Sequence, residues 1–215
     1  MSDKVRRRLP REVREQQIID AGIQVFSKRG YHAAVVDEIA DLAGISKPMV
    51  YLYFGSKEGL FIACIRREGE RITADFQHAA GAAPDAESQL WAGLSAFFAF
   101  VAGHRDGWVV LYRQAPEMGG DVAAEVNRQR ASVMTAVAAL VAHGMNGSQL
   151  PPGEAEFVAH ALVGAADSLT DWMERHPGES AERVTVRLMN MVWVGMRNVL
   201  DGEAWAPPSA AREAE

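Results

Sequence analysis

The sequence predicts an all-α protein of about nine helices. Apolar residues recur three and four positions apart through most of the chain, which is the period of an amphipathic helix. The period-two alternation of valine-rich strands is hard to find. The 215 residues can bury a substantial core, and a composition of 48% hydrophobic and 23% charged residues is ordinary for a globular protein.

The first three predicted helices are short and lie close together in the chain. The first covers about residues 12–29, and Gly30 is suited to end it because glycine adopts the left-handed conformation easily. The second covers about residues 36–43. The third follows Ser46, which is expected to cap its N-terminus, and it ends near Gly55.

Six further helices are predicted. Ser56 is expected to cap one that runs to about residue 80, and residues 81–84 form a linker. Clusters of Gly, Pro and Asn separate the remaining five helices. These lie at about residues 85–103, 106–114, 119–144, 153–175 and 179–201.

Charge is distributed unevenly along the chain. The formal net charge is −6, but residues 1–60 hold ten Lys or Arg against eight Asp or Glu, whereas residues 61–215 hold twelve against twenty. The positive excess is greatest in residues 1–14. Because a DNA-binding protein needs only a local basic face, the acidic total does not exclude this class. The asymmetry predicts a DNA-facing N-terminal end and an acidic body.

Several other protein classes are disfavoured. The single cysteine, Cys64, cannot build a disulfide framework or a cysteine metal cluster, and we expect it to be a buried, reduced thiol. The basic start is followed by Leu9–Glu12 rather than by an apolar segment, so no signal peptide is predicted. No apolar run is long enough to span a bilayer. We expect a cytoplasmic protein with no membrane partner, cofactor or metal.

Catalytic signatures are also missing from the sequence. It has no His-Glu-x-x-His motif, no phosphate-binding Gly loop, no Gly-x-Ser-x-Gly motif and no dinucleotide fingerprint. The six histidines are scattered and have no metal-ligand spacing. We therefore expect no enzyme activity.

Residues 36–54 have the pattern of a helix-turn-helix. Two short helices are joined at Gly44, which allows a sharp turn without a Cβ clash, and Ile39 and Ala40 point inward to set the angle between the helices. Ser46 leaves the N-terminus of the second helix open, where backbone amides attract a phosphate. The pattern predicts that this second helix enters the major groove of DNA.

The segment around the motif resembles the tetracycline-repressor (TetR) family of bacterial regulators. The resemblance covers about residues 12–62 and rests on an ordered series of residues at the family's spacing. The series is Ile19–Gly22, Phe26, Gly30–Tyr31, Val36–Ala40, Ala43–Ser46, Val50–Phe54 and Ser56–Leu60. The resemblance implies a three-helix DNA-binding domain followed by a divergent helical domain that binds a small molecule and dimerises.

The resemblance and the composition together predict that the chain divides into four parts. Residues 1–11 are expected to form a flexible basic arm, and residues 206–215 a disordered tail. Residues 12–58 are the expected helix-turn-helix DNA-binding domain. Residues 59–205 are the expected helical effector-binding and dimerisation domain.

The resemblance identifies the recognition helix as about Lys47 to Tyr53. At its start, Pro48 and Met49 could touch thymine methyl groups, and Lys47 could contact a guanine edge or a phosphate. The hydroxyls of two tyrosines and the lysine that opens the fourth helix are expected to contact phosphates. The predicted DNA-binding residues are Ser46, Lys47, Pro48, Met49, Tyr51, Tyr53 and Lys57.

The segment before the second helix departs from the family's pattern. The family usually has a Thr or Ser pair there, which caps the helix and touches phosphate, whereas this chain has Ala33–Val35. The change removes a cap of roughly 1 kcal/mol, although backbone amides could still meet the phosphate. We expect His32 to be solvated rather than to compensate. The arm residues Arg6–Arg8 either contact phosphates or the minor groove, or remain without a fixed contact.

The C-terminal helices are rich in aromatic residues and methionine. Most such side chains are expected to form the core, but the family binds inducers in a cavity between these helices, and such pockets are apolar with few polar groups. Asp167 could receive a ligand amine; capping or pairing with an arginine is equally open. The candidate effector-binding residues are Trp91, Phe98, Trp108, Tyr112, Asp167 and Trp172.

The last two helices are expected to form a homodimer interface. A helix that is apolar on more than one side needs more than one neighbour, here the core and a second subunit. The alternative is a wholly buried core helix. One predicted stripe of the last helix is Val184, Leu188, Met191, Gly195 and Val199, and the other is Met189, Val192, Trp193, Met196 and Leu200. Small residues of the helix before it are Ala161, Gly164, Ala165 and Ser168.

Together these features predict a homodimeric repressor that binds a pseudo-palindromic operator and is released by a small apolar or amphipathic effector. The resemblance implies that the effector shifts the fourth helix and thereby changes the separation of the two recognition helices. A regulator without a small-molecule effector, controlled by a protein partner or acting as an activator, remains an open alternative.

Overall fold

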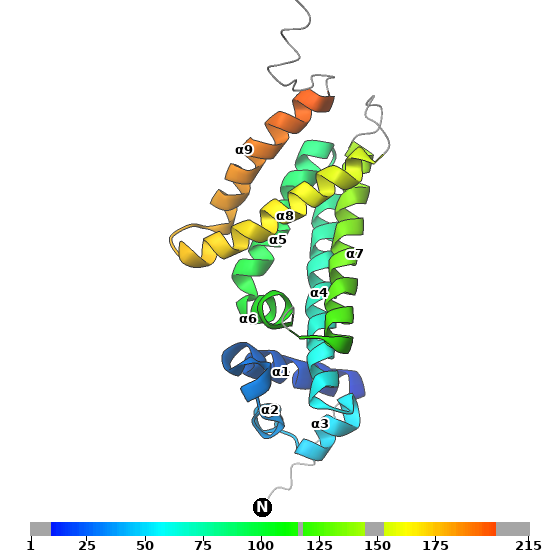
Figure 1. Ribbon diagram of the computed structural model, residues 1–215, viewed down its shortest axis with the longest axis vertical. Helices are drawn as coiled ribbons and strands as arrows, with labels where there is room; N and C mark the ends of the chain where they lie inside the picture. The colour runs from blue at the N-terminus through cyan, green and yellow to red at the C-terminus, as the bar shows by residue number, and fades with distance from the viewer. Residues whose placement is uncertain (1–9, 116–117, 145–152, 201–215) are drawn as a thin grey trace, which may run out of the picture. The chain divides into compact units, whose positions relative to one another are not determined.

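The computed structural model describes residues 10–115, 118–144 and 153–200. Over these residues the chain forms nine α-helices and one π-helix and no strand (Figure 1). The all-α prediction is therefore confirmed. The helices are α1 (Arg11–Ala33), α2 (Val36–Leu42), α3 (Lys47–Phe54), α4 (Lys57–Gly81), α5 (Ala86–Gly103), α6 (Arg105–Trp108), the π-helix η1 (Val109–Gln114), α7 (Gly120–Gly144), α8 (Glu154–Arg175) and α9 (Ala181–Leu200).

Some predicted features fall outside the described residues. The tail at 206–215 lies wholly outside them, and the arm at 1–11 does so except for its last two residues. Across the described part of the chain, no helix is both long and apolar enough to cross a membrane.

One helix differs in kind from its prediction. Residues 106–114 are predicted as a single helix, but the structure has the short α6 followed by η1. A π-helix bonds each amide to the carbonyl five residues back rather than four. The pattern of apolar residues does not report this change, because it concerns the hydrogen bonds of the backbone.

Two helix ends near the motif agree with their predictions. Gly30 has a φ of 75° and breaks the regular part of α1, although helical turns continue to Ala33 beyond this kink. Ser56 caps α4, because its Oγ accepts a hydrogen bond of 2.9 Å from the amide of Gly59.

The predicted side-chain cap of α3 is wrong. Ser46 occupies the N-cap position, but its hydroxyl makes no capping hydrogen bond. A capping side chain accepts from the amide two or three residues further on. Pro48 has no amide hydrogen, and the amide of Met49 donates instead to the carbonyl of Ser46 at 2.9 Å. The exposed hydroxyl of Ser46 therefore has no part in holding the helix.

The described residues divide into two compact units, each with its own apolar core. Unit 1 lies within Met1–Ile72 and His104–Ala131, and unit 2 lies within Thr73–Gly103 and Ser132–Glu215. This division by packing differs from the predicted division by function, because α6, η1 and the start of α7 pack with the N-terminal helices. The functional boundary near residue 58 remains a prediction.

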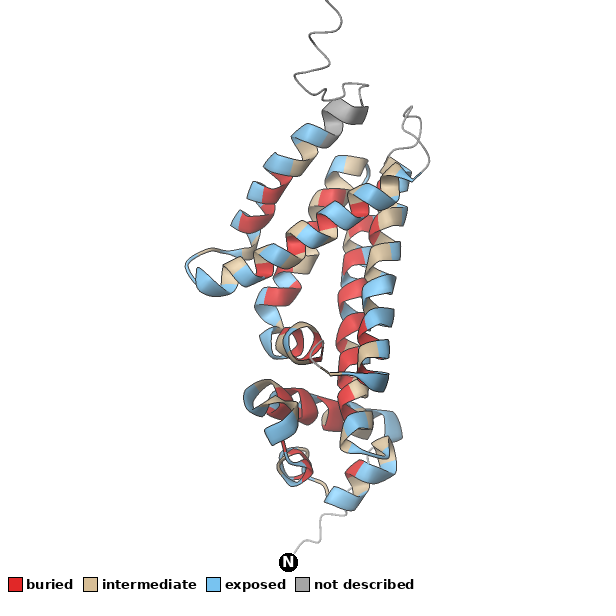
Figure 2. Cartoon of the chain, in the orientation of Figure 1, coloured by how far each residue is buried: buried red, intermediate tan, exposed pale blue. Residues whose placement is uncertain are grey.

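The core of unit 1 surrounds Phe26 of α1 and Phe61 of α4. Both side chains are completely buried, and their rings meet edge to face with centroids 4.9 Å apart. Buried residues run along α1 and the first half of α4 (Figure 2). Because α1 also packs against α6 and η1, the core that supports the helix-turn-helix includes Val110 and Leu111.

Unit 2 consists of helices that pack through a second apolar core. Within it, α5 packs against α8 and α9, and α8 packs against α9. Gly93 of α5 allows a close approach to the second half of α4, because a Cβ at this position would lie 2.5 Å from a ring carbon of Phe76. The core includes Phe98 and Leu188, which are almost fully buried.

The single cysteine is part of the core of unit 1. Cys64 is completely buried in α4, and its thiol donates a long hydrogen bond of 3.7 Å to the carbonyl of Ile19. Burial raises the pKa of the Cys64 thiol, so the thiolate is strongly disfavoured. The expectation of a buried free thiol is confirmed.

Candidate DNA-binding surface

The turn between α2 and α3 has the geometry of a helix-turn-helix. Gly44 has a φ of 66°, a conformation that glycine adopts without steric strain. The amide of Ile45 donates to the carbonyl of Ala40 at 3.0 Å and closes the end of α2. Ile39 and Ala40 are buried, as predicted, and they hold α2 against its neighbours.

Helix α3 is anchored through one side chain and exposes most of the others. Val50 is completely buried and is the one buried residue of this helix. Pro48 is exposed, Tyr51 is 40% exposed and Met49 is half-buried. The helix therefore offers a broad surface to a groove while its position is fixed from beneath.

Leu52 belongs to this surface and is missing from the predicted site. Its side chain is 73% exposed, more than any other large apolar residue that the structure describes in unit 1. Because helical residues are about 100° apart, a position two residues after the buried Val50 lies on the opposite face. This spacing was the signal in the sequence that could have identified it.

Lys47 is paired with the helix that precedes it. Its Nζ donates to Asp37 Oδ2 at 2.8 Å, and both side chains are exposed. The hydrogen bond and the charge of Asp37 raise the pKa of Lys47. An exposed pair of this kind contributes little to stability, so the ammonium group is available for exchange to another anion.

Tyr53 and Lys57 are more restrained than Tyr51. Tyr53 packs partly against the core, and the guanidinium of Arg11 lies 5.5 Å from the centre of its ring. Lys57 Nζ lies 4.6 Å from the centre of the Tyr31 ring and donates to the carbonyl of His32 at 3.3 Å. Partial burial lowers the pKa of Lys57, because the charged ammonium group loses water there.

The start of α2 has no side-chain cap, as the sequence predicts. Val35 is at the N-cap position in an extended conformation and makes no capping bond. The amide of Ile39 donates to the carbonyl of Val35 at 3.4 Å. His32 is exposed, in agreement with the expectation that it is solvated.

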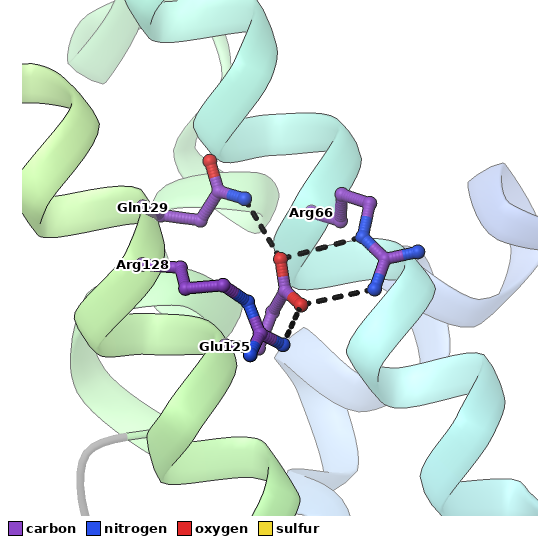
Figure 3. Close-up of polar contacts among 4 residues, drawn as sticks. All are labelled: Arg66, Glu125, Arg128 and Gln129. Carbon is purple, nitrogen blue, oxygen red and sulfur yellow. Dashed lines mark hydrogen bonds and ion pairs between the residues drawn. The ribbon is translucent and has the colours of Figure 1, made fainter.

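A buried carboxylate holds α4 against α7 within unit 1 (Figure 3). Glu125 is 1% exposed and accepts hydrogen bonds from Arg66 Nη2 at 3.0 Å, from Arg128 and from Gln129 Nε2 at 2.8 Å. Burial raises the pKa of Glu125, but these hydrogen bonds outweigh it and lower the pKa to about 2.

Sequence reasoning missed this network, although one signal was present. Glu125 lies between Val122 and Val126 on the buried face of α7, where an unpaired charge would be costly. Arg128 and Gln129 follow it by three and four positions and therefore lie on the same side of the helix. The contribution of Arg66, 59 positions away, is a tertiary contact that no local pattern contains.

The six candidate effector residues are distributed over both units. In unit 1, Trp108 is almost fully buried, and its ring stacks on Tyr112 with centroids 3.8 Å apart. The other four belong to unit 2, where Phe98 is buried and the others are half-buried. These four are Trp91, Phe98, Asp167 and Trp172. Their role in effector binding remains a prediction.

The two predicted stripes of α9 require a correction. Val184 and Leu188 are 1% and 2% exposed, whereas Met191, predicted on the same stripe, is 78% exposed. Leu188, Met189 and Val192 form the face of α9 that packs on the core. Met191 lies outside this face, so the predicted stripe does not share one side of the helix. The large exposed apolar side chains of α8 and α9 are Phe157, Val186, Met191 and Val194. Val199, Met196 and Leu200 lie where the structure describes no side chains.

Two family models match the chain over most of its length. The model described as bacterial regulatory proteins of the tetR family matches residues 18–64, which include α2 and α3. The model described as the tetracyclin repressor-like C-terminal domain matches residues 86–195.

Curated relatives match in sequence. The HTH-type transcriptional activator FasR of Mycolicibacterium smegmatis is 31% identical over 193 residues, which are 89% of this chain and 87% of that protein. The fatty acid metabolism regulator protein of Bacillus subtilis is 24% identical over 163 residues, which are 73% of this chain and 82% of that protein.

Solved structures match in fold. A TetR-like transcriptional regulator from Rhodococcus sp. RHA1 has a TM-score of 0.71 and 39% identity, covering 88% of this chain and 99% of that one. FadR from Bacillus subtilis in complex with stearoyl-CoA has a TM-score of 0.74 and 20% identity, covering 82% and 96%, and shows the fold alone.

The geometry and the matches agree on a single class of protein. A helix-turn-helix with an exposed second helix lies inside the first matched region, and the helical remainder lies in the second. The relatives are transcriptional regulators and not enzymes. The chain belongs to the tetR family of bacterial transcriptional regulators.

Proposed function

We propose that the chain binds a pseudo-palindromic operator as a homodimer and represses transcription until an amphipathic fatty acyl compound releases it. The observation that supports DNA reading most directly is the surface of α3, where Pro48, Tyr51 and Leu52 are exposed around one buried anchor. We assign its action to the cytoplasm, where operator DNA is found.

In the proposed complex, α3 enters the major groove. Pro48, Met49 and Leu52 meet the methyl groups of thymines, which are the apolar features of that groove. Lys47 exchanges its exposed partner Asp37 for a guanine edge or a phosphate. These contacts carry the sequence preference.

Phosphate contacts hold the protein in register. The hydroxyls of Ser46, Tyr51 and Tyr53 donate to phosphate oxygens on either side of α3. Lys57 is a strong candidate for the same task, because the Tyr31 ring and the His32 carbonyl orient its ammonium group without neutralising it. A phosphate would pair directly with this ammonium group.

The exposed apolar side chains of α8 and α9 support the proposed homodimer. Phe157, Val186, Met191 and Val194 are all exposed on these two helices, and apolar side chains that gather on one surface are typical of an interface. A two-fold dimer would use the same face on both subunits and would present two recognition helices to half-sites about 34–36 Å apart or a multiple of it.

The effector class is supported by two relatives and by the composition of unit 2. One relative is named for fatty acid metabolism, and another was solved with stearoyl-CoA. The aromatic candidates Trp91, Phe98 and Trp172 are of the kind that lines apolar pockets. Each methylene of an acyl chain that is buried contributes about 0.8 kcal/mol, so a long chain can bind tightly without many polar contacts.

An activator is the second candidate, and one observation favours it. The relative with 31% identity is named a transcriptional activator. A repressor and an activator would both read DNA with the α3 surface. What distinguishes them is the position of the operator relative to the promoter. In vitro transcription with and without the protein separates them: a fall in transcript supports a repressor, and a rise supports an activator.

DNA binding and release are tested together by fluorescence anisotropy. Labelled DNA from upstream of the chain's own gene is titrated with the full chain, and the expected Kd is about 10⁻⁸ M or lower. Stearoyl-CoA is then expected to raise this Kd by at least about fivefold, whereas coenzyme A without an acyl chain leaves it unchanged.

The two parts of the proposal fail separately. Binding to this DNA no tighter than to unrelated DNA contradicts the proposed operator. Tight binding that neither stearoyl-CoA nor stearate changes contradicts the effector class and favours a regulator without a small-molecule effector.

A further inference from the structure

A hydrogen bond from η1 reaches the end of α1 within unit 1. Gln114 is the last residue of η1, and its Nε2 donates to the carbonyl of Phe26 at 2.8 Å and to that of Ser27 at 3.5 Å. Both carbonyls lie in the turn of α1 that precedes the kink at Gly30. Carbonyls at the end of a helix lack the donors of a following turn, and a side chain can supply one.

The end of α1 leads directly to the DNA-binding surface. The ring of Tyr31 lies 4.9 Å from the ring of Phe61 and forms the surface on which Lys57 rests. The next carbonyl, that of His32, accepts the hydrogen bond from Lys57. A shift of this segment therefore changes both the start of α2 and the position of a predicted phosphate contact.

The element that carries Gln114 is itself unusual. π-Helical turns are rare and occur frequently at functional sites. Arg130 of α7 lies 5.5 Å from the centre of the Tyr112 ring in η1, and Tyr112 stacks on Trp108. A one-residue change of hydrogen-bonding register in η1 would turn its last residue by about 100° and withdraw Gln114 from α1.

The oxygen of the Gln114 side-chain amide makes no hydrogen bond to the described part of the chain. Gln114 Oε1 is buried and has no hydrogen-bond partner among the residues that the structure describes. Such atoms are uncommon in folded proteins. The amide is therefore held on α1 by its donor side alone, and withdrawing it breaks no other side-chain hydrogen bond.

We propose that Gln114 is the positioning residue that links the π-helical form of η1 to the DNA-binding arrangement of α1 and α2. With the hydrogen bond made, the end of α1 is fixed and operator affinity is high. With η1 in the other register, the bond is lost and affinity falls. The inference rests on the proposed function, because the effector is the agent that shifts η1 between the two states.

A matched pair of variants tests this role. Gln114→Met keeps the length of the side chain and removes the donor. Gln89→Met makes the same change in unit 2, where the amide nitrogen donates to the carbonyl of Ala83 at 3.1 Å and the amide oxygen is likewise buried without a partner among the described residues. Circular dichroism melting of both full-length variants measures how far each change affects stability.

Operator affinity and hydrogen exchange are the readouts. Gln114→Met is expected to raise the operator Kd of the effector-free protein about three- to tenfold and to speed amide exchange in residues 31–35. Stearoyl-CoA, the probe of the effector site, is expected to speed the same exchange in the wild type and to have a smaller effect on the variant's operator Kd. Gln89→Met is expected to change neither readout, because its amide has no contact with α1.

The outcomes separate this inference from the proposed function. Equal operator affinity and equal exchange in Gln114→Met and wild type overturn the inference, as do equal losses in both variants. If stearoyl-CoA does not bind the wild type in calorimetry, the effector class fails. In that case, operator affinity and exchange of the effector-free variants still decide the role of Gln114.

Discussion

At the scale of single residues, two lysines beside α3 differ in how the protein holds them. Lys47 is exposed and paired with a carboxylate that is also exposed, so water competes with its contacts. Lys57 is partly desolvated on an aromatic ring and a carbonyl, which orient its ammonium group. The restrained lysine loses less conformational freedom on binding a phosphate.

Lys57→Met is expected to weaken operator binding by a similar factor for all DNA sequences. Loss of one phosphate contact per subunit reduces the slope of log Kd against log salt by roughly one per subunit. Anisotropy titrations at several salt concentrations measure this slope. Arg71→Met, at an exposed position later in α4, serves as the control, and an equal change in both variants contradicts the phosphate contact.

The buried Glu125 gives a second prediction at this scale, because its stabilising effect depends on pH. Its pKa is about 2 in the folded protein and has a reference value of 4.5. A carboxyl group whose folded pKa is lowered stabilises the fold above its unfolded pKa, and this stabilisation is lost as the pH falls from about 5 to about 2. The loss follows protonation, which breaks the ion pairs with Arg66 and Arg128.

Glu125→Gln is expected to lower the free energy of unfolding by about 3 kcal/mol at pH 7 and to flatten its fall towards pH 3. Urea unfolding at both pH values measures this. Glu70→Gln, an exposed position in α4, is the control and is expected to change stability by less than about 1 kcal/mol. A Glu125→Gln variant that retains wild-type stability at pH 7 contradicts the account.

At the scale of the elements, Gly93 determines how closely α5 and the second half of α4 pack within unit 2. Gly93→Ala places a methyl group 2.5 Å from the Phe76 ring, and the resulting strain is expected to outweigh the roughly 1 kcal/mol gained in helix propensity. Thermal melting should show a lower Tm than the wild type. Gly81→Ala, where no atom lies within 4 Å, is the control; a Tm for Gly93→Ala at or above the wild-type value contradicts close packing.

Helix positions could be predicted because they depend on local patterns. Amphipathic period and Ser, Gly and Pro signals placed each helix within a few residues of its bounds. The exceptions depend on atoms that the pattern ignores. Pro48 removed one of the two amides that Ser46 could have capped and Met49 donates to the Ser46 carbonyl instead, while the register of η1 depends on backbone hydrogen bonds.

In the candidate site, too, the features set by local patterns could be predicted and those set by distant contacts could not. The turn at Gly44 and the order of residues in α3 identified the DNA-binding surface. Leu52 was left out although its spacing from Val50 places it on the opposite face, and the tertiary contacts of Glu125 and Gln114 were missed because they join segments 59 or more positions apart. Contacts of that length are set by tertiary packing.

At the scale of the whole molecule, the proposed function requires a second subunit. Met191→Glu introduces a charge on the exposed apolar side of α9, where the isolated subunit is expected to tolerate it. We expect light scattering to show a monomer and operator affinity to fall at least about tenfold. Thr135→Glu adds the same charge to an exposed position of α7 and should remain dimeric. A dimeric Met191→Glu variant contradicts an interface at this position.

Selection of DNA sequences from a random pool by the full-length protein tests the central claim most directly, namely that two copies of α3 read the two halves of one operator. The account predicts a two-fold symmetric consensus, together with a changed base preference at one symmetric pair of positions for Leu52→Ala. A consensus without symmetry, or one that Leu52→Ala leaves unchanged along with Pro48→Ala and Met49→Ala, would contradict it.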